Sequence, residues 1–544
     1  MATVSEKVRD YVTQSPEWKY LASRTRRIWA GPSAAQVERT LVESKWTPRR
    51  SGNVSFWIPL GLIVAGFVGS LVITASAPLW RLAVPSWRLT VPGIGHPGSA
   101  AASSFWFVTG MSLLALSWLG LIYVAARFET KKAIVTVALA LVVWAIPVSL
   151  GPPLLSNDVY SYVAQGEMAS RGIDPSTTGP ISLGRGDFTS GADPYWRPSP
   201  APYGPVAVAT ARSAVELSGH NAPAAINIYR VFVWIGIAVA AVGIGFIAAA
   251  NGLSPAVAIA IGLANPVVIV HLIGGAHNDA LMLGLLAAGL ALAQRGFKKW
   301  GVALIIAATA VKIPAAIALL YLGWCWNDRG DFKERLRTTA TVLATAFLSL
   351  VVASWLVGLG PGWLTALRST GKVNDTYSPT TKIGFSISEI LDTIGIRIDG
   401  QSLAGGVRSL GLLLTAVVVL IMLRRSPLVG FIKATAVVLV AYVILGPVIW
   451  PWYLPTGFAL LAACGLGRYR PSYFVVCIAV SFFVWPTSSI SLSSTTSYPH
   501  LRGLGVVLLV AGLAFGAQKF ANRLDRHGTD ASYADSRSLA ESQK

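Results

Sequence analysis

Long runs of apolar residues alternate with short polar segments along most of the chain. A run of about 18 or more apolar residues is long enough to cross a bilayer as a helix. The pattern therefore predicts an all-α polytopic membrane protein, a multi-helix transmembrane bundle. About twelve spans are predicted, several of them short, at residues 54–76, 105–126, 133–151, 226–250, 254–273, 279–294, 338–358, 406–423, 428–449, 455–467, 472–487 and 503–521.

Two further apolar stretches do not fit a simple crossing helix. Residues 203–217 are short and carry Arg212 and Glu216. Residues 300–322 are interrupted by Lys312 and a proline. Broken helices at membrane depth are tolerated only where protein or a water-filled cavity covers the freed backbone groups. We predict that both stretches are interfacial or re-entrant pieces that do not cross.

The composition supports a membrane protein and excludes other classes. Of the 544 residues, 53% are hydrophobic and 12% are charged, whereas about 25% of an average soluble protein is charged. A disordered chain, an ordinary soluble enzyme and a disulfide-rich module are therefore excluded. The three cysteines, Cys325, Cys464 and Cys477, show no paired spacing, so no structural disulfide or zinc site is predicted.

The net charge of +20 indicates how the chain is oriented. Such an excess occurs in nucleic-acid-binding proteins, but in membrane proteins it usually reflects Lys and Arg in short cytoplasmic loops. With twelve crossing helices every basic cluster falls on the cytoplasmic side. We therefore predict that both termini are cytoplasmic and that no nucleic acid is bound. The clusters are the N-terminal tail and residues 127–132, 295–299, 329–337, 424–433 and 468–470.

This topology divides the chain into three parts. Residues 1–53 are predicted as a basic cytoplasmic tail, residues 54–521 as the transmembrane domain and residues 522–544 as a polar cytoplasmic tail. Long loops between spans are commonly functional. The outer loops are predicted at residues 77–104, 152–202, 359–405 and 488–502, of which 152–202 is the richest in carboxylates and is the predicted catalytic loop.

The first candidate site is the motif Ser-Asn-Asp-Val-Tyr-Ser-Tyr at residues 156–162, directly after the third predicted span. A carboxylate at a membrane exit acts as a general base where it reaches a hydroxyl. Asp158 is in such a position, and the aromatic Tyr160 and Tyr162 lie beside it. The alternative is a helix cap, because Asn and Asp side chains accept hydrogen bonds from free backbone N–H groups.

A second candidate lies at the turn Gly-Gly-Ala-His-Asn-Asp, residues 274–279. His277, Asn278 and Asp279 are predicted at the outer mouth, where a histidine with a nearby aspartate binds phosphate, a metal or a sugar hydroxyl. The alternative is a cap, in which Asn278 or Asp279 starts the next helix. No metal site is predicted, because no motif of fixed ligand spacing is present.

Two more candidates lie further along the chain. Lys312 sits inside an apolar run, where an ionisable group is by default a functional hypothesis, and it could pair with a lipid phosphate. The alternative for Lys312 is snorkelling to the cytoplasmic surface. Trp450, Trp452 and Tyr453 could form a platform for a sugar, or they could anchor the chain in the aromatic belt of the membrane.

These candidates are far apart in sequence, but the predicted topology places most of them on one side. Asp158, the turn at 274–279 and the aromatic group at 450–453 all fall outside, opposite the basic clusters. One site at the outer water–lipid boundary, reached by a lipid-borne substrate, is the simplest common account.

Several motifs together resemble a known family. They are SNDVYSYVAQGEMASRGIDPSTTGP (156–180), DPYWRPSPAPYGPV (193–206), GGAHNDALM (274–282), VKIPAA (311–316) and WPWYLP (450–455). The chain resembles the MptB-type α-1,6-mannosyltransferases, which are polyprenol-phosphate-mannose-dependent enzymes of mycobacteria and corynebacteria. The resemblance runs from about residue 54 to residue 521.

The resemblance implies a GT-C fold in the bacterial plasma membrane with its active site facing outward. It implies transfer of mannose from polyprenyl-phosphate-mannose to a lipid-anchored mannan, building the α-1,6 core of lipomannan and lipoarabinomannan. Asp158 matches the general base of the superfamily. A β-linked donor and an α-linked product require inversion, hence a single displacement in which cations stabilise the leaving phosphate.

The complete prediction for the site therefore has one catalytic residue, Asp158, and a wider substrate-binding set. That set is Tyr160, Tyr162, His277, Asn278, Asp279, Lys312, Lys382, Trp450, Trp452 and Tyr453. Candidates for holding the phosphate are Lys312, Arg230, His277, Lys372 and Lys382. No nucleotide site is predicted, because no P-loop motif is present. A role for a divalent cation and the oligomeric state are left open.

The main alternative is a lipid-sugar flippase or secondary transporter. Such proteins often contain inverted repeats and bind near the bilayer midplane. Here no repeat is evident and the acidic residues gather in an outer loop, which favours the enzyme. Within the enzyme class, an α-1,2-mannosyl or arabinofuranosyl transferase is the nearest competitor.

Overall fold

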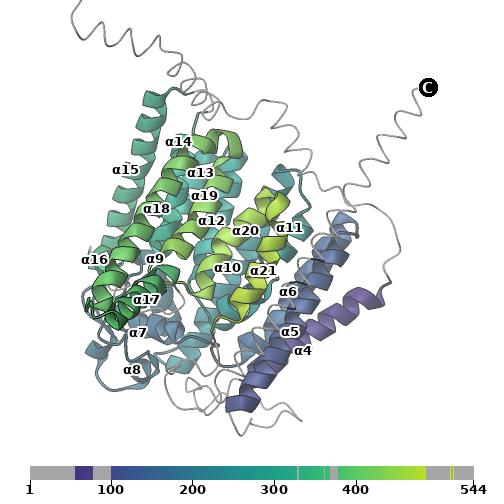
Figure 1. Ribbon diagram of the computed structural model, residues 1–544, viewed down its shortest axis with the longest axis horizontal. Coiled ribbons are helices and arrows are strands. Elements are labelled where there is room, and N and C mark those ends of the chain that lie inside the picture. The colour runs from purple at the N-terminus through teal and green to yellow at the C-terminus, as the bar shows by residue number, and fades with distance from the viewer. Residues whose placement is uncertain are drawn as a thin grey trace, which may run out of the picture.

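The computed structural model describes residues 55–76, 100–327, 330–360, 362–367 and 378–484, with single positions 512, 515 and 519. These residues form helices joined by turns and contain no β-strand (Figure 1). The predicted all-α polytopic class is confirmed. Both predicted tails, the predicted outer loop 488–502, nearly all of the span 503–521 and Lys372 lie outside the described residues.

Three helices at one flank of the bundle form a unit. They are α4 (Trp57–Ser76), α5 (Ala100–Ala125) and α6 (Thr130–Leu150) (Figure 1). α4 and α5 approach closely at Gly69. Only glycine fits there, since a Cβ would lie 2.8 Å from the carbonyl oxygen of Gly110. The indole N–H of Trp118 on α5 donates to the carbonyl oxygen of Ala260, 2.8 Å away, and ties this unit to the central helices.

The predicted span at 254–273 is a broken helix. Its halves, α11 (Pro255–Gly262) and the π-helical segment η3 (Val267–Gly274), meet at an angle of 63°. Asn265 lies at the break. Its amide donates to two carbonyl oxygens at the end of α11, and its Oδ1 accepts the N–H of Val268, all at 3.0 Å. The protein itself thus pairs the backbone groups that the break frees.

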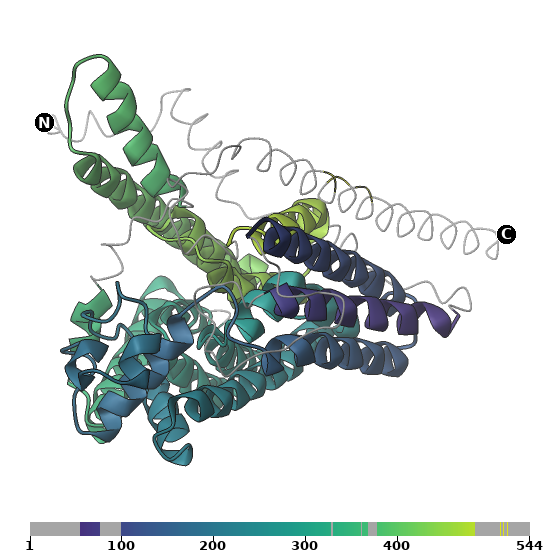
Figure 2. The same ribbon diagram turned by 90° about the horizontal axis from the view of Figure 1, so that it is seen from below.

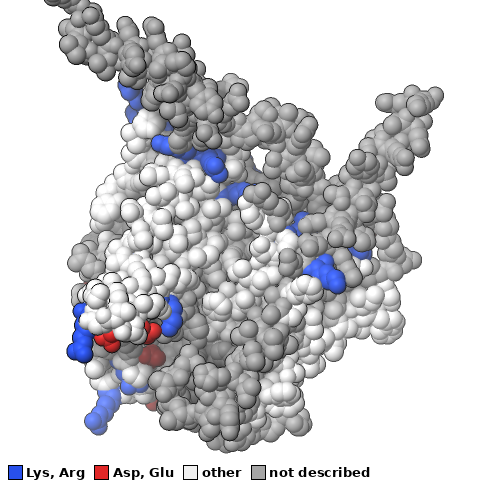
Figure 3. All heavy atoms as spheres, in the orientation of Figure 1, with Lys and Arg blue, Asp and Glu red and all other residues white. Residues whose placement is uncertain are grey.

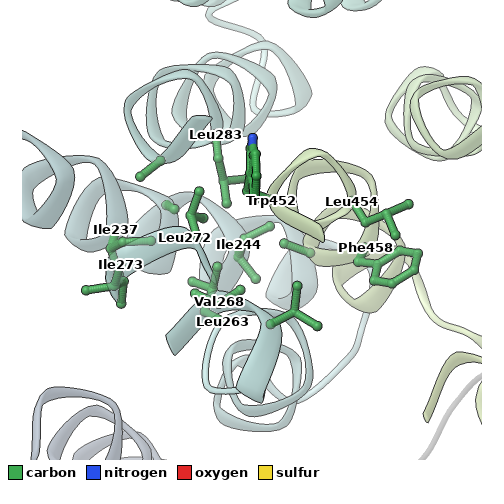
Figure 4. Packing of buried hydrophobic residues seen from close by; sticks show 14 of the residues in the cluster. Ile237, Ile244, Leu263, Val268, Leu272, Ile273, Leu283, Trp452, Leu454 and Phe458 are labelled. Carbon is green, nitrogen blue, oxygen red and sulfur yellow. The ribbon is translucent and has the colours of Figure 1, made fainter. Parts of the chain in front are cut away.

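The centre of the bundle is tightly packed around this break. α10 (Ala222–Ala250) crosses α12 (Asp279–Gln294) so closely that a Cβ on Gly284 would lie 2.4 Å from the carbonyl oxygen of Gly236. Figure 4 shows the buried side chains that fill the space around η3. The labelled ones come from α10, the residue directly after α11, η3, α12 and the later segment from Trp452 to Phe458, so η3 is packed from several sides.

The stretch predicted as re-entrant consists of α13 (Lys298–Val311), η4 (Ile313–Ala316) and α14 (Ile317–Trp324). α13 runs back along α12, and Lys312 lies at the turn after it. α14 then returns toward the start of α13. There the ammonium of Lys298, the first residue of α13, donates to the carbonyl oxygen of Trp326, just after α14. The stretch therefore begins and ends at the same end of the bundle, in keeping with the re-entrant prediction.

The helices after α14 follow in chain order. They are α15 (Phe332–Leu356), α16 (Gly362–Ala366), α17 (Pro379–Thr393), α18 (Gly400–Val429), α19 (Phe431–Leu445), η6 (Pro451–Tyr453), α20 (Leu454–Cys464), η7 (Gly467–Tyr469) and α21 (Arg470–Ser481). α20 and α21 pack into the centre, whereas α17 and the start of α18 form a hairpin that reaches outward (Figure 2).

Within the part of the chain that the structure describes, fewer helices are long enough to cross a membrane than the twelve spans predicted. Six described helices are long and apolar enough to cross a membrane: α4, α5, α6, α10, α15 and α18. The bent pair of α11 and η3 makes a seventh. The runs predicted at 279–294, 428–449 and 455–467 contain α12, α19 and α20, which have 16, 15 and 11 residues. Because apolar residues also occupy the turns, run length overstates helix length.

Charged side chains gather at the two ends of the bundle. On the face shown in Figure 3, Lys and Arg lie at the upper end and right flank, charges of both signs lie at the lower end near α17, and a broad band between carries none. This band is typical of a lipid-facing surface. A multi-pass membrane protein accounts for both the helices and the charges.

Candidate active site

Asp158 is the first residue of α7 (Asp158–Ser170), and its carboxylate does not cap the helix. The N-cap residue is Asn157, which makes no capping side-chain bond either. The preceding loop is fixed by a hydrogen bond from the N–H of Leu154 to the carbonyl oxygen of Gly274, 2.9 Å away. This bond brings the start of α7 to the turn that carries His277.

Asp158, Tyr162 and His277 form a compact cluster. The Tyr162 hydroxyl donates to Asp158 Oδ2 at 3.4 Å and lies 3.4 Å from His277 Nδ1. His277 Nδ1 is also 3.4 Å from Asp158 Oδ2. The imidazole is fully buried, whereas the Asp158 side chain is 21% exposed. One side of the carboxylate therefore stays open to a ligand.

An aromatic column holds the imidazole in place. The His277 ring stacks on Trp452 with centroids 4.0 Å apart and planes 13° apart, and Trp452 stacks on Trp450 at 5.2 Å. Trp452 is only 4% exposed, so its indole offers little surface to a sugar. The predicted sugar platform is therefore not formed by Trp452, which instead packs against the histidine.

Lys312 and Asp279 form a second polar pair. The Lys312 ammonium donates to Asp279 Oδ1 at 2.9 Å and Oδ2 at 2.8 Å, and it lies 4.1 Å from the centre of the Tyr453 ring. The two side chains are 14% and 2% exposed. Lys312 therefore does not snorkel to the cytoplasmic surface, because the turn after α13 aims it at the start of α12.

A cavity of about 110 Å³ opens beside this pair. Its polar lining consists of Lys312, Asp279, Tyr203, Tyr453 and Thr456. The rest of the wall is mostly apolar and includes Met282, Leu367, Leu439, Tyr442, Val443, Pro447 and Val448. A charged head group at one end of a largely apolar wall suits an amphiphilic ligand.

Tyr203 belongs to the site although the sequence did not single it out. Its ring lies 5.2 Å from that of Tyr162, edge to face. Gly204 permits this position, because a Cβ there would lie 2.3 Å from the carbonyl oxygen of Ala310 on α13. The next helix, α9 (Pro205–Leu217), starts at this contact. The only signal in the sequence was the Tyr-Gly-Pro turn at 203–205.

The other predicted residues make none of the contacts described above. Tyr160 is buried on α7, and burial raises the pKa of its hydroxyl to about 12 although the Arg230 charge opposes this. Arg230 donates to the carbonyl oxygen of Ser149 at 2.6 Å. Lys382 is exposed at the start of α17 and does not line the cavity. Asn278 is buried next to His277, and its side-chain amide has no protein partner among the described residues.

The environment keeps Asp158 ionised. Burial raises the pKa of its carboxyl, but the hydrogen bond and charge of His277, the charge of Lys312 and the hydrogen bond from Tyr162 outweigh burial and hold the pKa below its usual range. Burial, followed by the Tyr203 and Asp158 charges, places the pKa of Tyr162 well above its usual value. Tyr162 is therefore a phenol that donates and Asp158 a carboxylate that accepts.

The arrangement supplies an oriented carboxylate at Asp158 and a cation at Lys312, whose charge acts on that carboxylate and which lines the partly apolar cavity. The carboxylate can take a proton from a hydroxyl, and the ammonium can stabilise a phosphate oxygen. No group of three or more His, Cys, Asp or Glu side chains gathers at one point within the described residues. Fold and site together define a membrane protein equipped for group transfer at one end of its bundle.

Comparison with known proteins identifies the family. The chain matches the model of the alpha-(1→6)-mannopyranosyltransferase N-terminal domain at residues 63–328 and that of the MptB C-terminal domain at residues 380–514. The chain belongs to this family of membrane mannosyltransferases.

Individual relatives agree with this assignment. Alpha-(1→6)-mannopyranosyltransferase A of Mycobacterium tuberculosis is 30% identical over 426 residues, which cover 74% of this chain and 80% of the relative. Alpha-(1→6)-mannopyranosyltransferase B of Corynebacterium glutamicum is 28% identical over 464 residues, covering 78% of this chain and 76% of the relative. No solved structure is detectably similar to the chain.

Proposed function

We propose that this protein transfers mannose from polyprenyl-phosphate-mannose to a lipid-anchored mannan acceptor and forms α-1,6 linkages by a single inverting displacement. The product would be the mannan core of lipomannan and lipoarabinomannan. The proposal rests on two features of the site: an ionised, partly open Asp158, and the Lys312 ammonium, which lines a mostly apolar cavity and whose charge acts on Asp158. The names of the relatives supply the linkage and the sugar.

Asp158 is the general base in this proposal. Its free side takes the proton of the acceptor hydroxyl while that oxygen attacks the anomeric carbon of mannose. His277 and Tyr162 both contact Oδ2, so they orient the carboxylate and leave Oδ1 for the acceptor. A second catalytic carboxylate is not needed, because the departing phosphate is a good leaving group when a cation stabilises it.

Lys312 is the cation for the leaving phosphate. An ammonium has three N–H donors, and two of them reach the Asp279 oxygens. The third remains for a phosphate oxygen, and the Tyr453 ring beneath the ammonium favours its charge. The bond from the anomeric carbon to the phosphate oxygen breaks as the new glycosidic bond forms, and the polyprenyl phosphate leaves with both electrons.

The apolar part of the cavity suits the lipid chain of such a donor. Leu439, Tyr442 and Val443 on α19 face it together with Met282 and Leu367. A polyprenyl chain therefore passes along α19 while its phosphate stays at the lysine. A nucleotide-sugar donor would leave this apolar wall without a partner.

The decisive experiment is transfer by the full-length protein in nanodiscs. Polyprenyl-phosphate-[14C]mannose and a short α-1,6-mannoside acceptor are supplied, and the product linkage is determined. Labelled α-1,6 product from the wild type supports the proposal, and its absence overturns it. Asp158→Asn tests the base, and Asp187→Asn is the matched control, since Asp187 is exposed on the same predicted loop.

The predicted orientation is part of the proposal and has its own test. In a background without the three native cysteines, single cysteines at the exposed positions Arg185 and Lys299 are labelled in intact cells with a membrane-impermeant maleimide. We expect Arg185→Cys to react and Lys299→Cys to react only after permeabilisation. Reaction of both, or the reverse pattern, would overturn the outward-facing site.

A further inference from the structure

Helix α17 exposes a stripe of isoleucines that no described part of the protein covers. Ile383, Ile387, Ile390 and Ile394 are 51%, 38%, 64% and 66% exposed. Residues spaced by three or four positions lie on one face of a helix. The stripe therefore forms a continuous apolar ridge along the length of α17.

The other faces of α17 have different neighbours. One face packs on α18 through Gly384, where a Cβ would lie 2.3 Å from the Cα of Ala404. The exposed charges Lys382, Glu389 and Asp392 lie on another part of the helix surface, away from the isoleucine ridge. The helix therefore has a protein side, a charged side and a separate isoleucine ridge, which is the pattern of a helix in a membrane interface.

We propose that α17 lies in the interface of the leaflet at the active-site end, with its isoleucine ridge in the acyl chains and its charged side among the head groups. The occupant of the ridge is lipid because α18, on which α17 packs, is a candidate membrane span that exposes its own apolar side chains, with Leu410 and Leu413 53% and 61% exposed. α17 also lies at the lower end of the bundle in Figure 1 and reaches sideways from it in Figure 2.

The start of α17 is bonded to the wall of the cavity. The hydroxyls of Ser378 and Thr380 donate to the carbonyl oxygen of Gly446, and the Thr381 hydroxyl donates to that of Pro447, all at 2.9 Å. Gly446 and Pro447 line the cavity beside Lys312. The position of α17 in the membrane thus fixes one wall of the site.

Buried Arg408 strengthens this link. Its Nε donates to the Thr381 hydroxyl oxygen at 2.9 Å, so one threonine joins α18 to the 446–448 segment. A helix that is anchored in lipid on one side and bonded to the cavity wall at its start acts as a positioning element. It places the wall relative to the membrane from which a lipid-borne substrate arrives.

Spin labelling tests the membrane contact independently of any activity. In the cysteine-free full-length protein in nanodiscs, nitroxides are attached at Ile390→Cys and, as the matched control one residue away on the charged side, at Glu389→Cys. We expect the label at 390 to collide more with oxygen than with a water-soluble nickel chelate, and the label at 389 to show the reverse. Strong collision with nickel at both sites overturns the proposal, as does protection of 390 from both colliders, which would indicate a protein partner.

Kinetics test the coupling, and this arm rests on the proposed function. Ile387→Lys with Ile390→Lys is expected to raise the donor KM about fivefold with little change in kcat, because the wall shifts and the base does not. Glu389→Gln with Asp392→Asn adds the same charge on the other side and should leave KM unchanged. Equal KM values for both variants overturn the coupling, whereas loss of transfer by the wild type would overturn the proposed function only.

Discussion

Helix α7 carries a carboxylate near each end, and each is paired with a histidine, but the two pairs differ in how completely they are satisfied. Near the far end, Glu167 is 2% exposed and accepts from Arg171 Nε and His220 Nδ1, both at 2.7 Å. At the start, Asp158 is 21% exposed and its contacts with His277 and Tyr162 are both 3.4 Å long.

This difference separates a carboxylate that holds the structure together, Glu167, from the proposed general base, Asp158. Both carboxyl pKa values are held low against the effect of burial, by His220 and Arg171 at Glu167 and by His277, Lys312 and Tyr162 at Asp158. Both carboxylate oxygens of Glu167 are hydrogen-bonded to protein side chains, and the bond to His220 joins α7 to the turn before α10. Asp158 keeps an oxygen free, so only this carboxylate can accept a proton from a substrate.

The largest expected effect is at Asp158. Asp158→Asn retains the shape of the side chain but removes the proposed base, so we expect kcat to fall by about 10²- to 10⁴-fold. The apparent melting temperature should not fall, because the loose contacts contribute little. Radiolabelled transfer and thermal unfolding in nanodiscs measure the two quantities. Near-wild-type transfer by this variant would exclude Asp158 as the base.

The next effect is at Lys312. In the proposed reaction Lys312 stabilises the leaving phosphate, so for Lys312→Met we expect a loss of about 10²-fold in kcat/KM. This change also leaves Asp279 buried without its partner, which lowers stability. The double variant Lys312→Met with Asp279→Asn should recover the melting temperature but not the transfer rate. Recovery of both would show that the pair is structural.

A smaller effect is expected on the pH profile. Because the pKa of Asp158 is lowered, the carboxylate stays charged until the pH falls below the ordinary aspartate value of about 3.9. The acid limb of kcat/KM should therefore lie below that pH in the wild type. His277→Gln removes the main group that opposes burial, so the limb should move to higher pH. His220→Gln, at the other carboxylate, should leave the limb where it is.

The smallest effect on turnover is expected at Glu167. Glu167→Gln breaks bonds to two partly exposed partners and should cost about 1–3 kcal/mol of stability. Transfer per folded molecule should stay within about twofold of the wild type. Measurement of the melting temperature with the specific activity separates the two. A loss of transfer comparable to that of Asp158→Asn would mean that the far end of α7 also takes part in the reaction.

The sequence predicted the class of fold well and the site in part. Apolar runs located the helices, and the motif at 156–162 drew attention to Asp158, because both signals are local. The pairing of Lys312 with Asp279 was not predicted, since it joins residues 33 positions apart through the return of α13 along α12. The buried position of Trp452 was also not predicted. It follows from stacking on His277, which is distant in sequence, and the sequence alone does not distinguish a buried tryptophan from an exposed one.

The length of α13 sets the position of the cation in the site. The ammonium of Lys312 stands at the end of a 14-residue helix whose start is held at the opposite end of the bundle by the contact of Lys298 with Trp326. The length of α13 therefore fixes the distance between the Lys298 contact and the Lys312 ammonium. One alanine inserted within it would turn the lysine by about 100° and advance it by about 1.5 Å, away from Asp279. The number of residues in α13 is thus as important for the position of the Lys312 ammonium as the residues that contact it.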